Sequence, residues 1–323
     1  MEKLSFITTL KFVRGQILSW VMPSLKVLPL DVFAYRKVQS LKVSQDGHSE
    51  TSVCEKDNRL YIAKTLFAYR WTLEYEYLLN QASMYSVLSD IRIKSSTGRD
   101  INFPKLKGFF NGTPYVLVRE FVSGESIECK ALDFQREIFL DSINALRSCM
   151  KQISPEIKKC LPRRSNMLML VTFPVYAGIS FLRGRVSFRI LIRSIILFVK
   201  HSTSISWFNT DYVLTHRDLH PGNILLRDNN ITIIDTEEAL LTEDGTDMAV
   251  SFLRYFDWSD MTPNIEFLKQ SISSEEHGKF LILSIFYTLQ FMATDTSSEE
   301  DLTKKTRDYL TIIIDSIAPS LFG

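Results

Sequence analysis

Apolar and polar positions alternate in short runs through the first third of the chain, separated by polar turns around Gly47 and Asn58. Alternation with a period of two is typical of half-buried strands, whereas apolar residues recurring every three or four positions indicate a helix. The elements expected on this basis are strands at 38–43, 51–55, 59–66 and 115–122 and a helix at 68–81. This part of the chain therefore predicts a small antiparallel sheet accompanied by one helix.

The chain after residue 130 shows mainly helical spacing. Apolar residues recur at helical intervals through 131–153, and residues 190–199 fit a long central helix. Ser273 with Glu276, and Ser297 with Glu300, have the spacing of capping boxes that begin two further helices. We therefore expect a larger, mainly helical part after the sheet.

Between the helical segments, a polar loop precedes two short apolar runs. The loop has the sequence Thr215-His216-Arg217-Asp218-Leu219-His220-Pro221-Gly222-Asn223. The first apolar run, 224–226, follows it directly, and the second, 231–234, is followed by Asp235. The intervening polar residues predict a hairpin that presents Asn223 and Asp235 at neighbouring strand ends. Phosphoryl transfer needs a carboxylate that orients and deprotonates a hydroxyl, and oxygen ligands for Mg²⁺. Asp218 suits the role of the carboxylate that orients and deprotonates the hydroxyl, and Asn223 and Asp235 suit the role of Mg²⁺ ligands. The plainer interpretation is a polar turn with a capping Asp.

The string His-x-Asp-Leu-His-Pro-Gly-Asn-Ile-Leu, followed by Ile-Asp-x-Glu, resembles the aminoglycoside phosphotransferase and choline kinase branch of the protein-kinase-like superfamily. Bacterial lipopolysaccharide core kinases share the same plan, and the looser resemblance spans roughly residues 40–260. It implies an α+β, two-lobed fold. The implied parts are an N-terminal extension (1–35), a small antiparallel nucleotide-binding lobe (36–122) and a larger helical catalytic lobe (123–323).

The resemblance also assigns nucleotide contacts outside the loop, with ATP and Mg²⁺ as cofactors. Lys64 on the third strand resembles the lysine that pairs with ATP phosphates, and Glu74 is its expected helix-borne partner, with Glu76 as the alternative. Backbone groups from Glu120 to Val122 are expected to hold the adenine. Asp218 is the catalytic residue in this scheme, and Asn223 and Asp235 are the metal ligands.

Several positions depart from a protein kinase. The first turn has a single glycine, Gly47, and no Phe-Gly or long activation segment follows Asp235. Thr236 stands where the resembled family often has an aromatic residue. Glu237 stands where the resembled family often has a glutamate. It could assist Mg²⁺, contact the acceptor or cap the turn. Asp247 is interpreted as structural, steadying the loop.

The roles of the remaining loop residues are less sharply defined. His216 is expected to brace the loop as a neutral hydrogen-bonding residue, and Arg217 to brace the loop or touch the acceptor. No role is predicted for His220.

Composition narrows the class of protein. The chain has 323 residues, 45% hydrophobic and 12% aromatic, which is enough for a sizeable core, and its net charge of +1 gives no support for nucleic-acid binding. Four cysteines lack metal-ligand spacing and are expected to be buried free thiols of a reducing compartment. No secretory signal or wholly apolar run of membrane length is evident. We expect a cytoplasmic protein, with peripheral contact to the inner face of the membrane as the alternative.

Residues 157–200 contain nine Lys and Arg residues and no Asp or Glu. We interpret this region first as a buried helical hairpin with arginines at its solvent edge. The alternatives are a segment lying on an anionic membrane surface, or a site for a phosphorylated glycan or lipid-linked acceptor.

The leading functional hypothesis is a phosphotransferase that moves the γ-phosphate of Mg-ATP to a hydroxyl of a small molecule or glycan. The acidic run from Asp235 to Asp247 would suit a cationic acceptor such as an aminoglycoside or choline. The basic region would suit an anionic acceptor such as a lipopolysaccharide core sugar, toward which we lean. A protein Ser/Thr kinase and a non-catalytic nucleotide-binding scaffold are the alternatives.

Overall fold

The computed structural model describes residues 34–43, 49–67, 73–112, 114–208, 212–252, 255–256, 261–294 and 300–322. The chain divides into two compact units. The first consists of the chain up to Pro162 together with 221–240, and the second of 163–220 together with 241–323. Of the N-terminal extension, only residues 34 and 35 are described. The turn with Gly47 and the predicted helix start at Ser297 lie outside the described residues.

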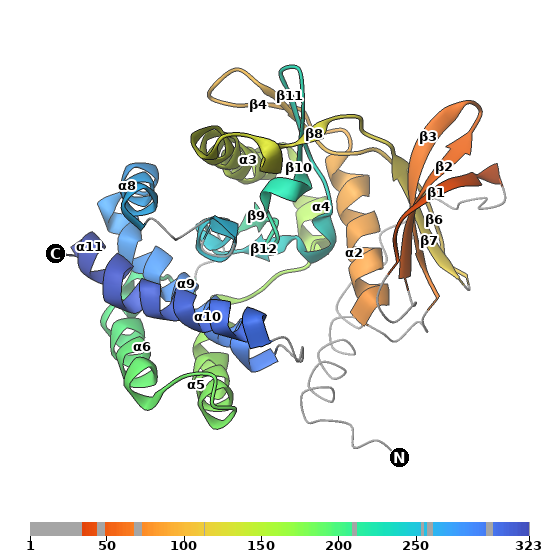
Figure 1. Cartoon of the computed structure of the whole chain (residues 1–323). Helices are drawn as coiled ribbons and strands as arrows, with labels where there is room; N and C mark the ends of the chain where they lie inside the picture. The colour runs from red at the N-terminus through yellow and green to blue at the C-terminus, as the bar shows by residue number, and fades with distance from the viewer. Residues whose placement is uncertain are drawn as a thin grey trace, which may run out of the picture. The chain divides into compact units, whose positions relative to one another are not determined.

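The first unit contains a five-stranded antiparallel sheet with the order β1-β2-β3-β7-β6 (Figure 1). Its strands are β1 (Arg36–Val43), β2 (Ser49–Lys56), β3 (Arg59–Leu66), β6 (Leu106–Phe110) and β7 (Tyr115–Glu120). The predicted strand meander is thus confirmed. In the register of the sheet, Lys64 on β3 lies opposite Leu117 on β7, so the predicted lysine strand and hinge strand are neighbours.

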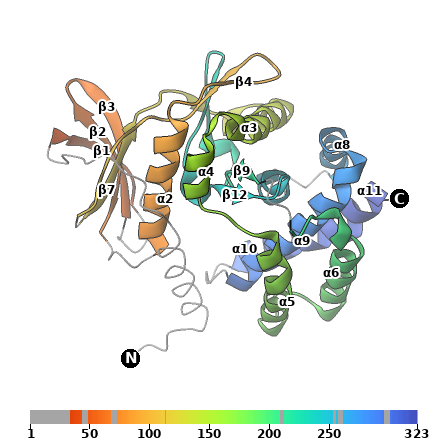
Figure 2. The same ribbon diagram turned by 180° about the vertical axis from the view of Figure 1, so that it is seen from behind.

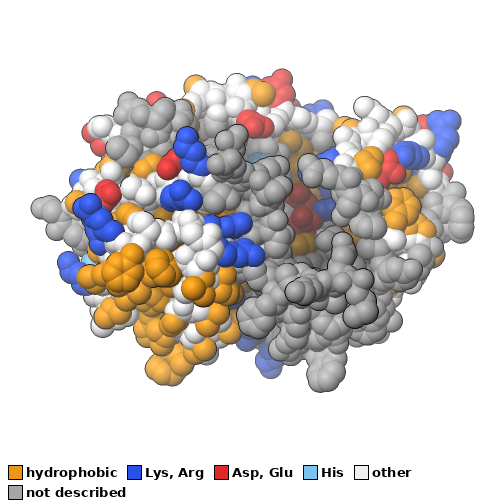
Figure 3. Space-filling model, turned by 60° about the horizontal axis from the view of Figure 1, so that its bottom comes forward, with side chains coloured by type: hydrophobic (Ala, Val, Ile, Leu, Met, Phe, Trp, Pro, Cys, Tyr) orange, Lys and Arg blue, Asp and Glu red, His pale blue; other side chains and the backbone are white. Residues whose placement is uncertain are grey.

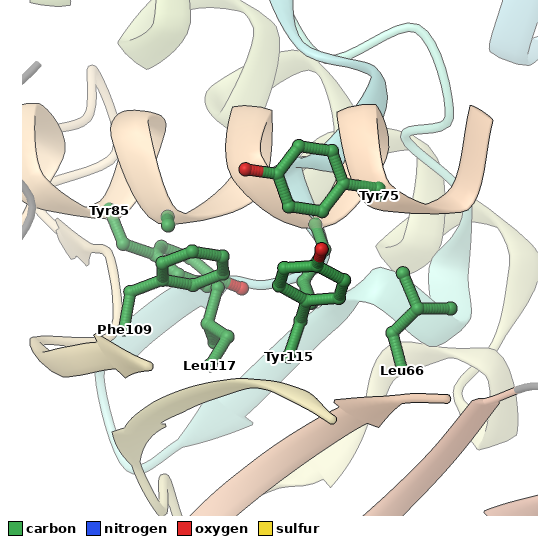
Figure 4. Packing of buried hydrophobic residues seen from close by; sticks show 8 residues of the cluster. Leu66, Tyr75, Tyr85, Phe109, Tyr115 and Leu117 are labelled. Atoms are coloured by element: carbon green, nitrogen blue, oxygen red, sulfur yellow. The ribbon is translucent and has the colours of Figure 1, made fainter. Parts of the chain in front are cut away.

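Helix α2 (Leu73–Leu88) packs across this sheet. Its inward residues Tyr75, Leu78, Ala82 and Tyr85 meet Leu66, Phe109, Tyr115 and Leu117 from the strands in one buried cluster (Figure 4). Burying apolar side chains contributes about 1.5–3 kcal/mol for each large residue. The cluster therefore fixes α2 firmly against the sheet.

The predicted helix at 68–81 is wrong at its end, because α2 continues to Leu88. The polar residues of α2 after Leu79 have partners that are compatible with a helix. The hydroxyls of Ser83 and Ser86 donate to backbone carbonyls one turn earlier, at 2.9 and 2.7 Å. Asn80 and Gln81 bond to the segment that follows the hairpin, as described below.

A second five-stranded sheet in the same unit has the order β4-β5-β11-β10-β8. It is formed by β4 (Ile93–Lys94), β5 (Asp100–Asn102), β8 (Glu125–Ser126), β10 (Ile224–Arg227) and β11 (Asn230–Ile233). Strands β10 and β11 are the predicted hairpin, with Ile224 opposite Ile233. The unit also contains α3 (Leu132–Gln152) and the short α4 (Pro155–Cys160), as Figure 2 shows from behind.

The second unit is mainly helical, as predicted. Its helices are α5 (Asn166–Leu182), α6 (Phe188–Lys200), α8 (Met261–Ser271), α9 (His277–Thr294), α10 (Glu300–Ile312) and α11 (Ala318–Phe322), with the π-helices η6 (Met248–Phe252) and η8 (Ile313–Ile317) and the strand pair β9 (Val213–Thr215) and β12 (Leu240–Thr242). Ser273 and Glu276 form the predicted capping box just before α9. Most side chains of α9 are buried, so α9 is the central helix of the unit.

Residues 190–199 do form a helix, but α6 is not a buried core helix. Only Leu191, Ser194 and Phe198 are buried along it. Helices α5 and α6 lie side by side, and the rings of Phe173 and Phe198 stack between them with centroids 3.8 Å apart. Among the helices of the described residues, none combines the length and the apolar character that crossing a bilayer requires.

The cysteines only partly follow the expectation of buried thiols. Cys54 and Cys149 are buried and free, whereas Cys129 is free and exposed. Cys129 lies in a short 3-10 turn after β8, where the chain runs over the surface of the unit. The side chain of Cys160 falls outside the described part of the structure.

Candidate functional site

The hairpin of the first unit places Asn223 and Asp235 at adjacent strand ends, as predicted. The Ile234 N–H donates to the Asn223 carbonyl at 2.9 Å, directly before Asp235. On the other side, the Ser126 hydroxyl donates to the Pro221 carbonyl at 3.0 Å, which holds the turn that leads into Asn223. Asn223 itself is buried.

Asp235 leaves the hairpin in a left-handed backbone conformation, with φ of 61°. This conformation is uncommon for residues other than glycine, although Asp and Asn tolerate it best. Its N–H donates to the Tyr85 hydroxyl at 2.9 Å, and Gln81 Nε2 donates to its carboxylate at 2.7 Å. Two side chains of α2 therefore fix both the backbone and the carboxylate of Asp235.

Lys64 lies beside the same carboxylate. Its ammonium is 3.6 Å from Asp235 Oδ1 and donates a hydrogen bond to the carboxylate of Glu237. Burial lowers the pKa of the Lys64 ammonium, but the two neighbouring carboxylates outweigh that effect, so the pKa lies above its ordinary value. Burial and the adjacent Asp235 raise the pKa of Glu237, against the opposing effect of Lys64. One ammonium thus faces two carboxylates in a half-buried position.

The partner of Lys64 differs from the sequence expectation. Within the described residues the carboxylates that meet Lys64 are those of Glu237 and Asp235, whereas Glu74 lies in α2 with its side chain outside the described part. Glu76, the alternative, is partly buried and is not among those ion-pair partners. The contributions of α2 that the structure shows come from the Tyr85 hydroxyl and from two amide side chains.

Asn80 is one of these amides and was missed by the sequence analysis. Its Nδ2 donates to the carbonyls of Glu237 and Ala239 at 2.7 and 2.9 Å. This holds the 3-10 turn η5 (Thr236–Glu238) against α2. The signal that could have found Asn80 and Gln81 is a pair of amide residues inside an otherwise apolar helical stripe.

The predicted adenine strand ends at Glu120, and Val122 follows outside any helix or strand. The Glu120 N–H donates to the Lys105 carbonyl at 2.9 Å and is therefore already engaged. The expected adenine contacts at this position remain a prediction for the groups that follow Glu120.

Asp218 lies in the second unit, on the loop after β9. The Tyr255 hydroxyl donates a hydrogen bond to Asp218 Oδ1. His220 Nε2 is 4.0 Å from Asp218 Oδ2, and the His220 and Tyr255 ring centroids are 4.9 Å apart. The sequence predicted no role for His220 and did not single out Tyr255, and both prove to lie against the predicted catalytic carboxylate.

Asp247 holds the backbone of this loop, in agreement with its predicted structural role. Its carboxylate accepts the N–H groups of His216 and Arg217 at 2.9 and 2.6 Å. Burial raises the pKa of the Asp247 carboxyl, although the two backbone hydrogen bonds act in the opposite direction. The Leu219 N–H donates to the Ser251 hydroxyl at 3.2 Å. Asp247 and η6 thus determine the conformation of the loop.

Arg217 adopts a left-handed backbone conformation, with φ of 67°, and its guanidinium lies 5.7 Å from the ring centroid of Tyr287 on α9. Burial raises the pKa of the Tyr287 hydroxyl, but the cations of Arg164 and Arg217, with other contacts, bring it below its ordinary value. His216 is fully buried. Both residues therefore point into the unit, which favours the loop-bracing interpretation of Arg217.

Comparison with known proteins identifies the fold. No family model matches the chain, and no curated protein matches it in sequence. Similar solved structures include a thermostable mutant of aminoglycoside phosphotransferase APH(4)-Ia with ADP and hygromycin B, at 9% identity and TM-score 0.62, covering 87% of this chain and 94% of that one. Choline kinase from Cryptosporidium parvum matches at 14% identity and TM-score 0.55, covering 96% and 99%. A putative fructosamine-3-kinase from Haemophilus somnus matches at 14% identity and TM-score 0.50, covering 87% and 92%. The chain therefore has the α+β protein-kinase-like fold that its motifs predicted.

Proposed function

We propose that this protein transfers the γ-phosphate of Mg-ATP to a hydroxyl group of a small molecule or glycan. The observation that supports the proposal most directly is the cluster of Lys64, Asp235 and Glu237, with Gln81 fixing the Asp235 carboxylate. Similar folds support it too, since an aminoglycoside phosphotransferase of similar fold was crystallised in a ternary complex with ADP and hygromycin B.

The residues present fit a magnesium ion. Asp235 and Asn223 supply oxygen ligands, and Mg²⁺ typically takes only one or two protein carboxylates beside phosphate and water. Lys64 alone does not balance the carboxylates of Asp235 and Glu237, which leaves negative charge for a cation to neutralise. The buried Gln81 Oε1 has no hydrogen-bond partner within the described residues, and metal-bound water would provide one. The ion would neutralise charge on the transferring phosphates.

The remaining residues take the following roles in the proposal. Lys64 binds ATP phosphate oxygens, and Glu237 keeps its ammonium in position before the nucleotide arrives. Asp218 orients the acceptor hydroxyl and accepts its proton. Tyr255 fixes the rotamer of the Asp218 carboxylate through its hydrogen bond. Asp218 precedes Asn223 by five residues in the chain, so one short segment supplies both the proton acceptor and a metal ligand.

The structure bears on the acceptor through the acidic run that suggested a cationic substrate. Glu237 is bound to Lys64, and Glu243 accepts a hydrogen bond from Asn166 and lies 3.2 Å from Lys279 Nζ. Two of the acids that could have attracted a cationic acceptor are therefore already paired with other side chains of the protein. This favours a neutral or anionic hydroxyl compound, in agreement with the glycan toward which the sequence leans.

The test compares the native chain with Asp218→Asn and Asp235→Asn. We expect Mg-ATP to raise the melting temperature of the native protein and of Asp218→Asn, but much less that of Asp235→Asn. Slow ATP hydrolysis should be lost in Asp218→Asn. Asp228→Asn is the matched control, because Asp228 is an exposed residue of the same hairpin that also has a positive φ of 53°. A folded native protein without Mg-dependent nucleotide binding would leave the non-catalytic scaffold as the better description.

A further inference from the structure

The α5–α6 hairpin exposes an unusual number of large apolar side chains. On α5 they are Leu168, Leu170, Val171, Val175, Phe181 and Leu182, and on α6 they are Phe188, Ile192, Ile196 and Val199. Leu182 and Phe188, at the turn between the helices, are 83% and 66% exposed. A space-filling view shows hydrophobic side chains gathered over this part of the second unit, with Lys and Arg side chains beside them (Figure 3). Contiguous apolar patches of this kind mark interaction surfaces.

The apolar residues of α6 form a regular stripe. Phe188, Ile192, Ile196 and Val199 follow the spacing of one helix face, which is separate from the buried face of Leu191, Ser194 and Phe198. The helix therefore has two apolar faces, and its own unit covers only one of them. Phe188 meets Phe181 of α5 edge-on, with ring centroids 6.1 Å apart, but the four side chains of the second face remain 38–66% exposed.

Basic residues accompany this stripe. Arg189, Arg193 and Lys200 recur at four- and seven-residue intervals and so lie along one line beside it. Arg193 is paired with Asp315, whereas Arg189 and Lys200 are exposed and have no acidic partner among the described side chains. The sequence contains no Asp or Glu from residue 157 to residue 210. The exposed side chains of the hairpin itself are thus apolar and basic, and Asp315 of η8 is the acid that meets them at Arg193.

The turn between the helices is held firmly. Gly184 has a positive φ of 66°, and its N–H donates to the Phe181 carbonyl at 2.8 Å. The guanidinium groups of Arg183 and Arg185 donate to the carbonyls of Ala293 and Met292, at the end of α9, at 3.2 and 2.7 Å. Leu182 and Phe188 are therefore presented from a fixed turn.

We propose that the α5–α6 face docks on the surface of an anionic lipid bilayer, without crossing it. Apolar side chains would enter the boundary between headgroups and acyl chains while Arg189 and Lys200 meet anionic headgroups, as in interfacial helices. A second copy of the chain fits less well, because the same face on both copies would bring like charges together. The proposal goes beyond the phosphotransferase function and does not depend on it.

Vesicle flotation tests this with the full chain. We expect the native protein to float with vesicles of phosphatidylcholine containing about one-third phosphatidylglycerol, to float far less with pure phosphatidylcholine, and to release as salt screens the charges. Leu182→Ser with Phe188→Ser should reduce the bound fraction about tenfold, and so should Arg189→Gln with Lys200→Gln. Circular dichroism shows whether each variant is folded. We expect folded variants, because all four side chains are exposed.

The control variants replace exposed apolar residues and exposed basic residues outside this face. Val38→Ser with Val43→Ser removes two apolar side chains that are exposed on β1, and Lys42→Gln with Lys151→Gln removes two exposed charges outside the face. Both control proteins should float like the native chain. Absence of flotation with anionic vesicles, or equal losses in test and control variants, would overturn the proposal. So would a native dimer that Leu182→Ser with Phe188→Ser converts to a monomer, because a second copy would then cover the face.

Discussion

Lys64 on β3 donates a hydrogen bond to the carboxylate of Glu237, a residue 173 positions later in the chain. The contact joins the central strand of the first sheet to the turn that follows the β10–β11 hairpin. It also places Glu237, two residues after the proposed metal ligand Asp235, directly on the proposed phosphate-binding lysine. Glu237 is therefore more than a cap of its turn.

Replacing this carboxylate should weaken ATP binding. In Glu237→Gln the lysine loses a charged partner and has only Asp235 nearby, so it is less well positioned for phosphate. We expect kcat/KM for ATP to fall roughly tenfold, equivalent to about 1.4 kcal/mol. Glu238→Gln removes the next acid along, which makes no contact with Lys64, and should leave kcat/KM near the native value.

The same variant should shift the alkaline limb of the pH profile. The pKa of Lys64 is raised in the folded protein, so its stabilising charge is present at neutral pH and is lost as the pH rises through the folded-state value. The carboxylate of Glu237 is one of the groups that raise the pKa of Lys64, so that pKa should be lower in Glu237→Gln. Activity of Glu237→Gln should therefore decline at lower pH than that of the native enzyme, and coincident alkaline limbs would contradict this account.

Asp247→Ala should destabilise the second unit. The substitution leaves the N–H groups of His216 and Arg217 without their acceptor in a buried position. Unsatisfied buried donors cost about 1–3 kcal/mol each, so the loss of both hydrogen bonds should lower the free energy of unfolding by about 2–6 kcal/mol. Urea denaturation measures the loss. Asp244→Ala, whose carboxylate accepts from Gly245 in a turn, should cost clearly less.

The sequence was most informative where local chemistry determines the structure. The polar residues 227–230 between two short apolar runs predicted the β10–β11 hairpin, because turn residues and short apolar runs both act over a few positions. The placement of Asn223 beside Asp235 followed from the pairing of those strands. The role of Asp247 was predicted through the family resemblance, and its hydrogen bonds agree with it.

The sequence was least informative where distant segments meet. Asn80 and Gln81 looked like the end of a helix, because nothing local shows that the segment after Asp235 satisfies their amides. The pairing of Lys64 with Glu237 spans two distant parts of the chain and has no spacing signature. The apolar pattern of α6 predicted burial, yet periodicity reports which residues are apolar and not whether the protein itself covers them.

The thiols of Cys129, just before α3, and of Cys149, within α3, should differ sharply in reactivity. Burial raises the pKa of the Cys149 thiol to about 12, whereas Cys129 is exposed. Alkylation requires the thiolate and access to it, so iodoacetamide at mildly alkaline pH should label Cys129 rapidly and Cys149 only after unfolding. Peptide mass spectrometry with and without urea gives both rates. Equal labelling of both cysteines in the native protein would contradict the packing of α3.

The last prediction concerns Tyr255, whose hydroxyl bonds to the Asp218 carboxylate. Tyr255→Phe keeps the ring against His220 but removes the hydrogen bond that fixes the carboxylate. If Asp218 orients the acceptor hydroxyl, kcat should fall about tenfold, or about 1.4 kcal/mol. The KM for ATP should change little, because Asp218, whose carboxylate Tyr255 fixes, is proposed to act on the acceptor hydroxyl and not on ATP.

The matched control is Tyr176→Phe, a tyrosine on α5 whose ring contacts Phe286. It should leave kcat unchanged, which separates loss of one particular hydroxyl from loss of any tyrosine hydroxyl in this unit. A role for Tyr255 confined to stability would lower the melting temperature of Tyr255→Phe while its kcat stayed native. A fall in kcat at an unchanged melting temperature would instead identify Tyr255 as the residue that positions Asp218 for the transfer step.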